Sequence, residues 1–330
     1  MQLTIVKPGV LSTVQDMGRW AYLSHAVPVS GPMDSLSARM ANLALGNTEE
    51  APFIEFTYAA AEFTIDAPSL LAYAGEGAFL SCHNQLLPAN RPIFVPGGLQ
   101  ISLKNNRKGS RTYLAIAGGF DIPSVLDSYS TYLPAQIGGV SGRALQAGDI
   151  LMGNDCLTIL NKAHIGRLSG EVIAFPKWSV SKTALGMQNT NVIRVMSGPE
   201  FSSFDMASLS TMFNTAFTMS SQSNRMGYRL NGPVMQRVNT SELLSTAVTM
   251  GTIQVTGNGD LILLMADCQT TGGYPRIAQV ASVDLPLCGQ LKPDDQIFFK
   301  QISQADAEMQ YIEREQNLQK VRAALNARFL

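Results

Sequence analysis

Charged side chains are scarce in this sequence. Lys, Arg, Asp and Glu together make up 15% of the 330 residues, whereas an ordinary soluble domain has about 25%. The formal net charge is −1, so the chain lacks the basic surface with which proteins bind a phosphate backbone. A dedicated nucleic-acid-binding protein is therefore not expected. The shortage of charge indicates surface that is buried against lipid or against other protein.

Long apolar runs are missing too, which argues against lipid. A membrane-spanning helix needs about 18 consecutive apolar residues, but the longest runs are short, and one of them ends at Asp267. The N-terminal residues MQLTIVKPGVLSTVQD lack the basic start and the long apolar middle of a secretory signal. We therefore expect a cytoplasmic protein whose hidden surface contacts protein.

Cysteine is rare and scattered. The cysteines form no CxxC pair; they are Cys82, Cys156, Cys268 and Cys288. Neither a disulfide framework nor a zinc site is indicated, so we expect buried, reduced thiols and no metal site. The sequence also lacks a GxxxxGKS or GxxxxGKT phosphate loop, an HExxH motif and a GxSxG nucleophile elbow.

Short apolar or alternating runs separated by turn formers make up most of the chain. Residues 3–6, 61–65 and 112–117 are three such runs, and Gly, Pro or Asp follows each of them closely. β-Branched and aromatic residues favour strands, whereas Gly and Pro supply the backbone angles of turns. The pattern predicts a mainly-β protein with many short strands, as in barrels and sandwiches.

Helical spacing of apolar residues occurs near the start of the chain and at its end. In residues 34–45 the apolar positions share one face, with Asp34 or Ser35 placed to cap the helix and Gly46 placed to end it. A helix is therefore predicted there.

The tail, residues 301–330, shows the second helical pattern, and Ser303 with Asp306 resembles a capping box at its start. Its apolar stripe indicates packing on its own barrel or on a neighbour. The predicted division of the chain is a β-rich domain at 1–175, a linker at 176–191, a β-barrel domain at 192–300 and this helix.

Four segments are rich in Gly and polar side chains and hold much of the charge outside the tail. They are residues 9–34, 128–143, 221–230 and 251–276. Arg offers a planar fork suited to carboxylate, carbamate or phosphate, and backbone N–H groups of Gly-rich loops bind anions. One interpretation, which we favour for the four segments together, is a ligand site. The other is that Gly makes turns and each Arg–Asp pair fastens a loop without any ligand.

The same segments resemble the KipA family. Residues 8–42 read PGxxxTxQDxGRxxxxxxxVPxSGxMDxxSxRxAN, residues 223–232 read SxRMGYRLxG and residues 270–280 read TTGGYPxIAxV. The resemblance covers about residues 3–299 in order. This family includes the KipA-type subunit of 5-oxoprolinase, one of the proteins similar to the second part of allophanate hydrolase, and the matching half of the carboxyltransferase domain of urea carboxylase.

The resemblance implies tandem cyclophilin-like β-barrel domains, with the C-terminal α-helix outside the match. It also implies two partners, a KipI-like protein and a LamB/YcsF-like protein, which are the other subunits of 5-oxoprolinase. With ATP, and with Mg²⁺ accompanying it, such a complex opens the lactam of 5-oxo-L-proline to L-glutamate. The chain is then expected to be part of an amide hydrolase that is inactive without its partners.

Two alternatives stay open at this point. The chain is a component of a biotin-dependent carboxyltransferase that transfers carboxyl to urea or an amide in the allophanate pathway, with biotin as the cofactor. Otherwise it is a regulator that binds a KipI-like inhibitor of a sensor kinase without turnover. The resemblance leaves the choice between 5-oxoproline and a urea-type substrate undecided.

The resemblance and the loop chemistry together point to a set of site residues. The residues expected to act in catalysis are Asp34, Arg225 and Gln254, and those expected to bind substrate or anion are Gln15, Asp16, Arg19, Met33, Arg143, Met226, Thr270, Thr271, Gly272, Gly273 and Tyr274. Arg19 and Arg225 are expected to hold the substrate carboxylate or a phosphorylated intermediate, and Asp34 to orient or deprotonate. Backbone amides of residues 272–273 are expected to stabilise an oxyanion.

Four positions depart from the family's usual residues. Members commonly have Gly where this chain has Asp127, Arg where it has Pro134, Asp where it has Asn224 and Pro where it has Thr256. We expect the loss of the Arg and the Asp to weaken an anion contact or an ion pair. Either a partner supplies the missing groups, or the chain has drifted in substrate or activity.

Overall fold

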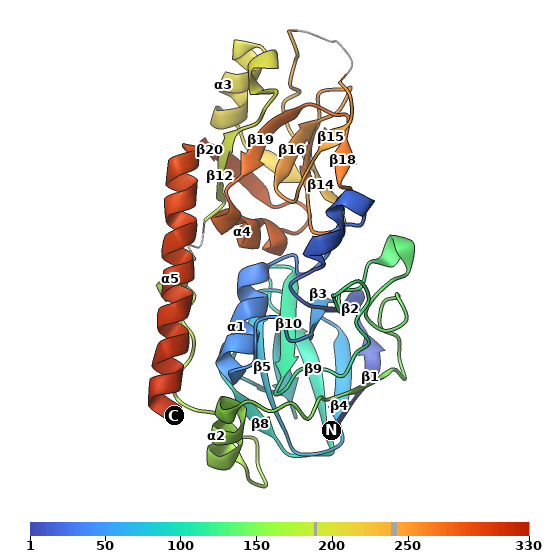
Figure 1. Ribbon diagram of the computed structural model, residues 1–330, viewed down its shortest axis with the longest axis vertical. Helices are drawn as coiled ribbons and strands as arrows, with labels where there is room; N and C mark the ends of the chain where they lie inside the picture. The colour runs from blue at the N-terminus through green and yellow to red at the C-terminus, as the bar shows by residue number, and fades with distance from the viewer. Residues whose placement is uncertain (188–189, 239–242, 330) are drawn as a thin grey trace. The chain divides into compact units, whose positions relative to one another are not determined.

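The chain forms two compact units in the computed structural model (Figure 1). The structure describes residues 1–187, 190–238 and 243–329. Unit 1 consists of Met1–Arg19, Ser30–Gly186 and Gln316–Leu330, and unit 2 consists of Trp20–Val29 and Met187–Glu315. Residues 188 and 189 of the predicted linker, and residue 330 of the predicted helix, lie outside the described residues. The predicted domain boundaries stay predictions.

Unit 1 is built on two antiparallel sheets. The first has the strand order β11-β1-β4-β9-β6-β7, with β1 (Gln2–Pro8), β4 (Ala61–Ile65), β6 (Ala78–Cys82), β7 (Gln85–Leu86), β9 (Leu99–Asn105) and β11 (Ile150–Met152). The second has the order β2-β3-β10-β5-β8, with β2 (Leu11–Gln15), β3 (Phe53–Thr57), β5 (Ser69–Gly75), β8 (Ile93–Val95) and β10 (Arg111–Ile116). The runs predicted as strands at residues 3–6, 61–65 and 112–117 thus lie in β1, β4 and β10.

The core of unit 1 draws apolar side chains from both sheets. In the second sheet, Val14, Ile54 and Leu114 occupy adjacent register positions on β2, β3 and β10 and belong to this core. Because side chains alternate along a strand, the neighbouring positions face away from the core. That opposite face packs under helix α1 (Ser35–Leu45), which contacts β5 and β10.

Helix α1 begins and ends where the sequence predicts. The Asp34 side chain accepts a hydrogen bond from the Ser37 backbone N–H and caps the first turn, and Gly46 ends the helix in the left-handed conformation at φ 81°. A Cβ at residue 46 would lie 2.5 Å from a Leu160 side-chain atom. Glycine is therefore needed at this position for its backbone angle and for its small size.

His164 of helix α2 (Ile159–Leu168) is buried in unit 1. Its ring centroid lies 5.8 Å from that of Trp178. Burial lowers the pKa of His164 from 6.5 to about 4, and the positive charge of Arg167 adds to this shift. The folded chain therefore holds this imidazole neutral.

We expect this histidine to make stability fall with pH. Its contribution is complete above about pH 6.5 and is lost as the pH falls toward 4, because the unfolded chain takes up a proton in this range and the folded chain does not. One such group gives a slope of about 1.4 kcal/mol per pH unit. Urea unfolding of the wild type and His164→Gln at pH 7 and pH 5 measures this slope. A difference in unfolding free energy between the two proteins that stays constant with pH would contradict the prediction.

Unit 2 contains a closed β-barrel. Its strands in barrel order are β12 (Val192–Ser197), β19 (Arg276–Val280), β16 (Thr252–Val255), β17 (Leu261–Leu264), β14 (Gly227–Asn231), β13 (Phe217–Met219) and β20 (Gln296–Gln301). The ring closes through the parallel pairing of β12 with β20, whereas the other pairs are antiparallel. Closure satisfies the backbone groups that an open sheet leaves unpaired at its edges.

The remaining elements are short except for the last helix. They are β15 (Thr246–Ala247) paired with β18 (Thr271–Gly272), α3 (Met206–Asn214), α4 (Leu285–Gln290), α5 (Gln304–Phe329) and the 3₁₀ turns η1 (Trp20–His25), η2 (Leu133–Ala135), η3 (Thr183–Leu185), η4 (Phe201–Ser203) and η5 (Ser282–Asp284). The predicted mainly-β fold with a barrel, a few short helices and a C-terminal helix is confirmed.

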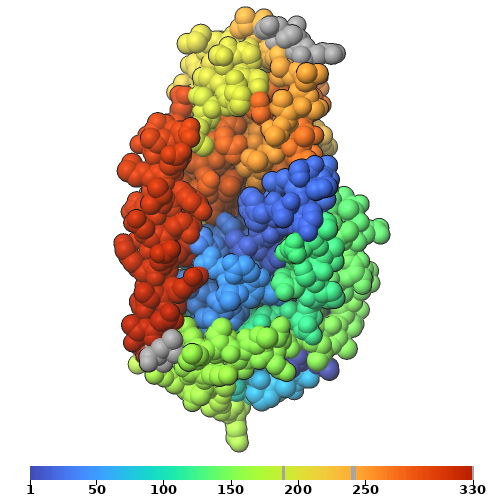
Figure 2. Space-filling view, in the orientation of Figure 1, coloured from blue at the N-terminus to red at the C-terminus, as the bar shows by residue number. Residues whose placement is uncertain are grey.

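Helix α5 begins at the predicted cap. The Ser303 hydroxyl accepts a hydrogen bond from the Asp306 backbone N–H and donates one to the Asp306 carboxylate. Ala307 packs in a small apolar cluster with Ala281 and Val283, so the start of α5 lies on its own barrel. Figure 2 shows the helix at the molecular surface. Within the part of the chain that the structure describes, no helix is long and apolar enough to cross a membrane.

The cysteines do not all have the expected environment. Cys82, Cys268 and Cys288 are buried as expected, but Cys156 is exposed, which corrects the prediction for that residue. It lies beyond the end of β11, in a turn where its backbone N–H donates to the Asn154 side chain. Its position in a loop, rather than on a strand, explains its exposure.

Candidate functional site

The predicted site residues form two groups, one in each unit. Unit 1 holds Gln15, Asp16, Arg19, Met33, Asp34 and Arg143, and unit 2 holds Arg225, Met226, Gln254, Thr270, Thr271, Gly272, Gly273 and Tyr274. Hydrogen bonds and burial define the surroundings of the residues in each group.

Asp16 is the centre of the group in unit 1. Its buried carboxylate accepts hydrogen bonds from Gly18 N, Ser128 Oγ, Tyr129 N and Ser130 Oγ, at 2.5 to 2.9 Å. The Asp16 backbone N–H also donates to Ser130 Oγ at 3.0 Å. The carboxylate therefore fixes the loop at residues 128–130 against the end of β2.

Gln15 and Arg19 lie beside this loop and are almost fully buried, at 0% and 1% exposed. Gln15 Nε2 donates to Thr13 Oγ1 at 3.0 Å and to the Thr131 carbonyl at 3.2 Å. Arg19 Nη2 donates to the Ser130 carbonyl at 2.5 Å. The structure thus brings Gln15, Asp16 and Arg19 together around one loop.

Arg143 has a different partner. Its guanidinium forms a two-pronged pair with Asp149, through Nη1–Oδ2 at 2.7 Å and Nη2–Oδ1 at 2.8 Å. The hydrogen bond from Arg143 is the main cause that holds the pKa of the Asp149 carboxyl below its usual value. Arg143 thereby fastens its own loop, as the interpretation without a ligand describes.

Met33 and Asp34 meet a buried polar row that sequence reasoning missed. Thr13, Glu55 and Tyr113 are register partners on β2, β3 and β10, on the face that lies under α1. The Met33 backbone N–H donates to Glu55 Oε2 at 2.9 Å, and the Asp34 backbone N–H donates to the Tyr113 hydroxyl at 2.8 Å. The available signal was the single Glu within the otherwise uncharged run at residues 53–57.

The polar row contains further charge. Arg111 Nε lies 3.7 Å from Glu55 Oε1, with both side chains buried. Burial raises the pKa of Tyr113 well above its usual value, and the negative charges of Glu55 and Asp34 add to the shift. Tyr113 is therefore a neutral hydrogen-bonding group at physiological pH.

The role of Asp34 can be tested by two substitutions. Asp34 Oδ1 accepts from Ser37 N at 2.9 Å and Oδ2 accepts from Ser37 Oγ at 2.6 Å, so the carboxylate caps α1. We expect Asp34→Ala to lower the free energy of unfolding by about 1–2 kcal/mol and Asp34→Ser to retain most of it, because serine also caps helices. Urea unfolding measures both. Full turnover by a stable Asp34→Ser variant would exclude the carboxylate from catalysis.

In unit 2, Arg225 pairs with Asp267, another residue that sequence reasoning missed. Arg225 Nε lies 2.8 Å from Asp267 Oδ2 and Nη2 lies 3.1 Å from Asp267 Oδ1, with both side chains buried. The Asp267 backbone N–H returns a hydrogen bond to the Arg225 carbonyl at 2.9 Å. The signal in the sequence was that an apolar run stops at this aspartate. Part of the Arg225 guanidinium is thus committed to an internal carboxylate.

Gln254 and the Thr270–Tyr274 segment lie together. Gln254 is buried on β16, and its Nε2 donates to the Tyr274 carbonyl at 3.1 Å. A Cβ at Gly272 would lie 2.8 Å from Gln254 Nε2, so glycine allows this close approach. Thr271 and Gly272 form β18, whereas the Tyr274 side chain is half exposed.

Met226 and Thr270 have backbone contacts next to these residues. The Met226 carbonyl accepts from the Met265 N–H and the Thr270 carbonyl accepts from the Val248 N–H, both at 3.0 Å. The structure therefore places Arg225, Met226, Gln254 and residues 270–274 on neighbouring barrel strands and loops, and the roles predicted for them stay predictions.

The four departures from the family pattern fit their local backbone. Asp127 lies in the left-handed region at φ 56°, a conformation for which glycine is best suited and which Asp tolerates. Asn224 Oδ1 accepts from the Met226 N–H at 2.8 Å, a turn that Asp also makes. Pro134 lies in the first turn of η2, where proline needs no partner for an N–H. Thr256 Oγ1 accepts from the Asp260 N–H at 3.1 Å in a tight turn.

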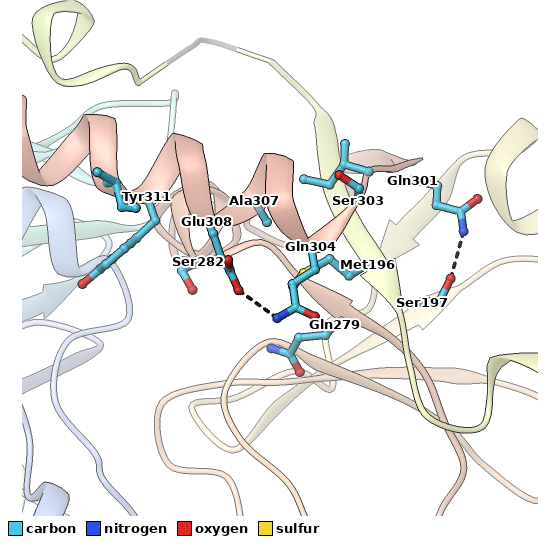
Figure 3. A pocket seen from close by; sticks show the side chains of 12 residues that line it. Met196, Ser197, Gln279, Ser282, Gln301, Ser303, Gln304, Ala307, Glu308 and Tyr311 are labelled. Atoms are coloured by element: carbon cyan, nitrogen blue, oxygen red, sulfur yellow. Dashed lines mark hydrogen bonds between the residues drawn. The ribbon is translucent and has the colours of Figure 1, made fainter.

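A separate hollow of about 850 Å³ lies in unit 2 between the start of α5 and the barrel (Figure 3). Its lining includes Gln301, Gln304 and Glu308, with Met196 and Ile302 as apolar members. None of the predicted site residues lines it. Across the described parts of the chain, no group of three or more His, Cys, Asp or Glu side chains is placed to hold a metal ion.

Comparison with known proteins gives one family. The family model described as carboxyltransferase domain, subdomain A and B, matches residues 25–301. A protein of Escherichia coli that is named as one of the subunits of 5-oxoprolinase is 35% identical over 305 residues, which cover 92% of this chain and 93% of that protein.

Longer proteins match over one part of their length. The urea amidolyase of Saccharomyces cerevisiae is 30% identical over 91% of this chain, but the match spans 17% of that protein. The crystal structure of the K. lactis urea amidolyase superposes with a TM-score of 0.86 and 29% identity, covering 97% of this chain and 20% of that chain. The chain therefore corresponds to a small part of these amidolyases.

Proposed function

The chain belongs to the carboxyltransferase domain family, subdomains A and B, and from this we propose that it serves as the KipA-type subunit of a heteromeric, ATP-dependent 5-oxoprolinase. The observation that carries the proposal is the 35% identity to the Escherichia coli 5-oxoprolinase protein over 92% of this chain and 93% of that protein. The family resemblance found in the sequence motifs is confirmed by the same match. In the proposed complex, the partners are a KipI-like protein and a LamB/YcsF-like protein, and the reaction opens 5-oxo-L-proline to L-glutamate.

The chemistry of the described residues supports binding and charge stabilisation rather than nucleophilic attack. Burial raises the pKa of Cys268 to about 12 and that of Cys288 further, so these thiols do not form thiolates readily. His164 is buried and neutral. Arg19, by contrast, is a buried cation fixed at the Ser130 carbonyl, and we assign it the substrate carboxylate or a phosphorylated intermediate.

ATP and Mg²⁺ are assigned to the complex rather than to this chain. The described residues offer no group of three or more carboxylate, imidazole or thiol ligands for a metal ion, so they do not fit a Mg²⁺ site of their own. The role proposed for Arg19 does not involve the metal.

The proposal is tested by reconstitution. We expect ATP-dependent formation of L-glutamate from 5-oxo-L-proline when the chain is mixed with its two partner proteins, and no turnover when any one of the three is omitted. Glutamate is quantified by chromatography, with a sample without ATP as the control. Full turnover by the two partners alone would refute the proposal.

A second candidate is a component of a biotin-dependent carboxyltransferase. It is favoured by the TM-score of 0.86 to the K. lactis urea amidolyase over 97% of this chain. This function predicts carboxyl transfer to urea from a biotinylated carrier, which a radiolabelled bicarbonate assay detects. Stoichiometric binding of a KipI-like protein without turnover in either assay would instead favour the regulator.

A further inference from the structure

The orientation of the Gln15 carboxamide is fixed by its neighbours. The Thr131 carbonyl oxygen can only accept a hydrogen bond, so the atom that faces it at 3.2 Å must be the amide nitrogen. The second hydrogen of the same nitrogen is directed to Thr13 Oγ1 at 3.0 Å. Both N–H groups of Gln15 are therefore used, and the carboxamide cannot flip without losing them.

This orientation leaves a buried acceptor unused. Gln15 Oε1 has no hydrogen-bond partner within the described residues and no solvent-exposed surface. A buried carbonyl oxygen without a donor is unfavourable, and native structures rarely retain one. Since Oε1 carries no hydrogen, only a donor group can satisfy it.

Ser30, in the neighbouring loop, is in a similar state. Its hydroxyl is buried without a hydrogen-bond partner among the described residues, and its backbone is left-handed at φ 57°. A Cβ at the following residue, Gly31, would lie 3.3 Å from the Asp16 carbonyl, so this turn rests on the segment that follows Gln15. Unsatisfied polar groups and non-glycine residues in this conformation concentrate at ligand-binding sites.

Resting on the proposed function, we propose that Gln15 Oε1 accepts a hydrogen bond from the amide N–H of the substrate and makes the site selective for ligands that carry one. A lactam and urea both present an N–H next to a carbonyl, whereas a lactone of the same shape presents only oxygens. The N–H satisfies Oε1, and the lactone leaves it buried beside a second acceptor. Because Oε1 is closed off from solvent, a ligand reaches it only when neighbouring side chains move aside.

The test compares 5-oxoproline with 5-oxotetrahydrofuran-2-carboxylate, the lactone that has oxygen in place of the N–H. Affinities for the reconstituted complex are measured by calorimetry, and urea is titrated in parallel to identify which N–H compound binds. We expect the lactone to bind about 10–100-fold more weakly than 5-oxoproline. In Gln15→Met, which removes the acceptor, we expect the two affinities to differ by less than about threefold. Gln146→Met, at an exposed glutamine, is the matched control and should keep the wild-type ratio.

The outcomes separate the two proposals. Equal affinity of the wild type for lactam and lactone overturns the inference alone, because an ordered water then satisfies Oε1, and this result needs no variant. An unchanged ratio in a folded Gln15→Met variant overturns it as well. If the wild-type complex binds neither 5-oxoproline nor urea, the proposed function fails and the inference fails with it.

Discussion

Replacing Asp267 by alanine is expected to lower the free energy of unfolding by about 3–5 kcal/mol. The substitution leaves the Arg225 guanidinium, which is 5% exposed, without the carboxylate that it contacts through Nε at 2.8 Å. An uncompensated buried cation has a large desolvation cost, whereas the intact pair is close to neutral in net stability. Urea unfolding followed by circular dichroism measures the change.

The control for this prediction removes both charges at once. We expect Arg225→Met/Asp267→Leu to recover most of the stability that Asp267→Ala loses, because the buried charge is gone and the volume is retained. If the single and double variants were equally destabilised, the ion pair would not be the cause. If the stable double variant retained full turnover, Arg225 would have no role in binding the substrate anion.

Asp16→Ala is expected to have the second large effect, a loss of about 3 kcal/mol or more in unfolding free energy. The buried carboxylate accepts from two backbone N–H groups, those of Gly18 and Tyr129, and from the hydroxyls of Ser128 and Ser130. Each donor left without a partner costs about 1–3 kcal/mol. We also expect faster hydrogen exchange at the Tyr129 amide and a loss of turnover in the complex, because the loop beside Gln15 and Arg19 loses its anchor.

The matched control for Asp16 is Asp66, which accepts from the Gln2 backbone N–H at an exposed position. We expect Asp66→Ala to change the stability by less than about 1 kcal/mol, because water replaces the lost acceptor. Equal stability of the two variants would show that the Asp16 carboxylate does not organise the loop. The comparison separates loss of an aspartate as such from loss of the buried contacts.

Local patterns were sufficient for the elements of secondary structure. The run at residues 61–65 is strand β4, and α1 has Asp34 at its start and Gly46 at its end. Alternation, capping and left-handed glycine are properties of a few consecutive residues. For this reason they are legible in the sequence without knowledge of the rest of the fold.

The surroundings of the arginines were not legible in the same way. The sequence shows that the charge is concentrated in four Gly-rich segments and in the tail, and it leaves open whether the Arg residues bind a ligand or fasten loops. The structure pairs Arg143 with Asp149 and Arg276 with Glu200, while Arg19 lies at a backbone carbonyl. Residues of one motif type thus have different surroundings, which no local pattern distinguishes.

By itself, the sequence determined the mainly-β class, the two capped helices and the membership of a family, because these depend on short-range periodicity and on motifs read in order. Only the tertiary structure decided which buried groups meet. Asp16 contacts residues 128–130, and Glu55 is placed between Thr13 and Tyr113 by the register of β2, β3 and β10. Such pairings follow from strand order and register, which set the neighbours of a side chain across more than a hundred residues and are not encoded in any one segment.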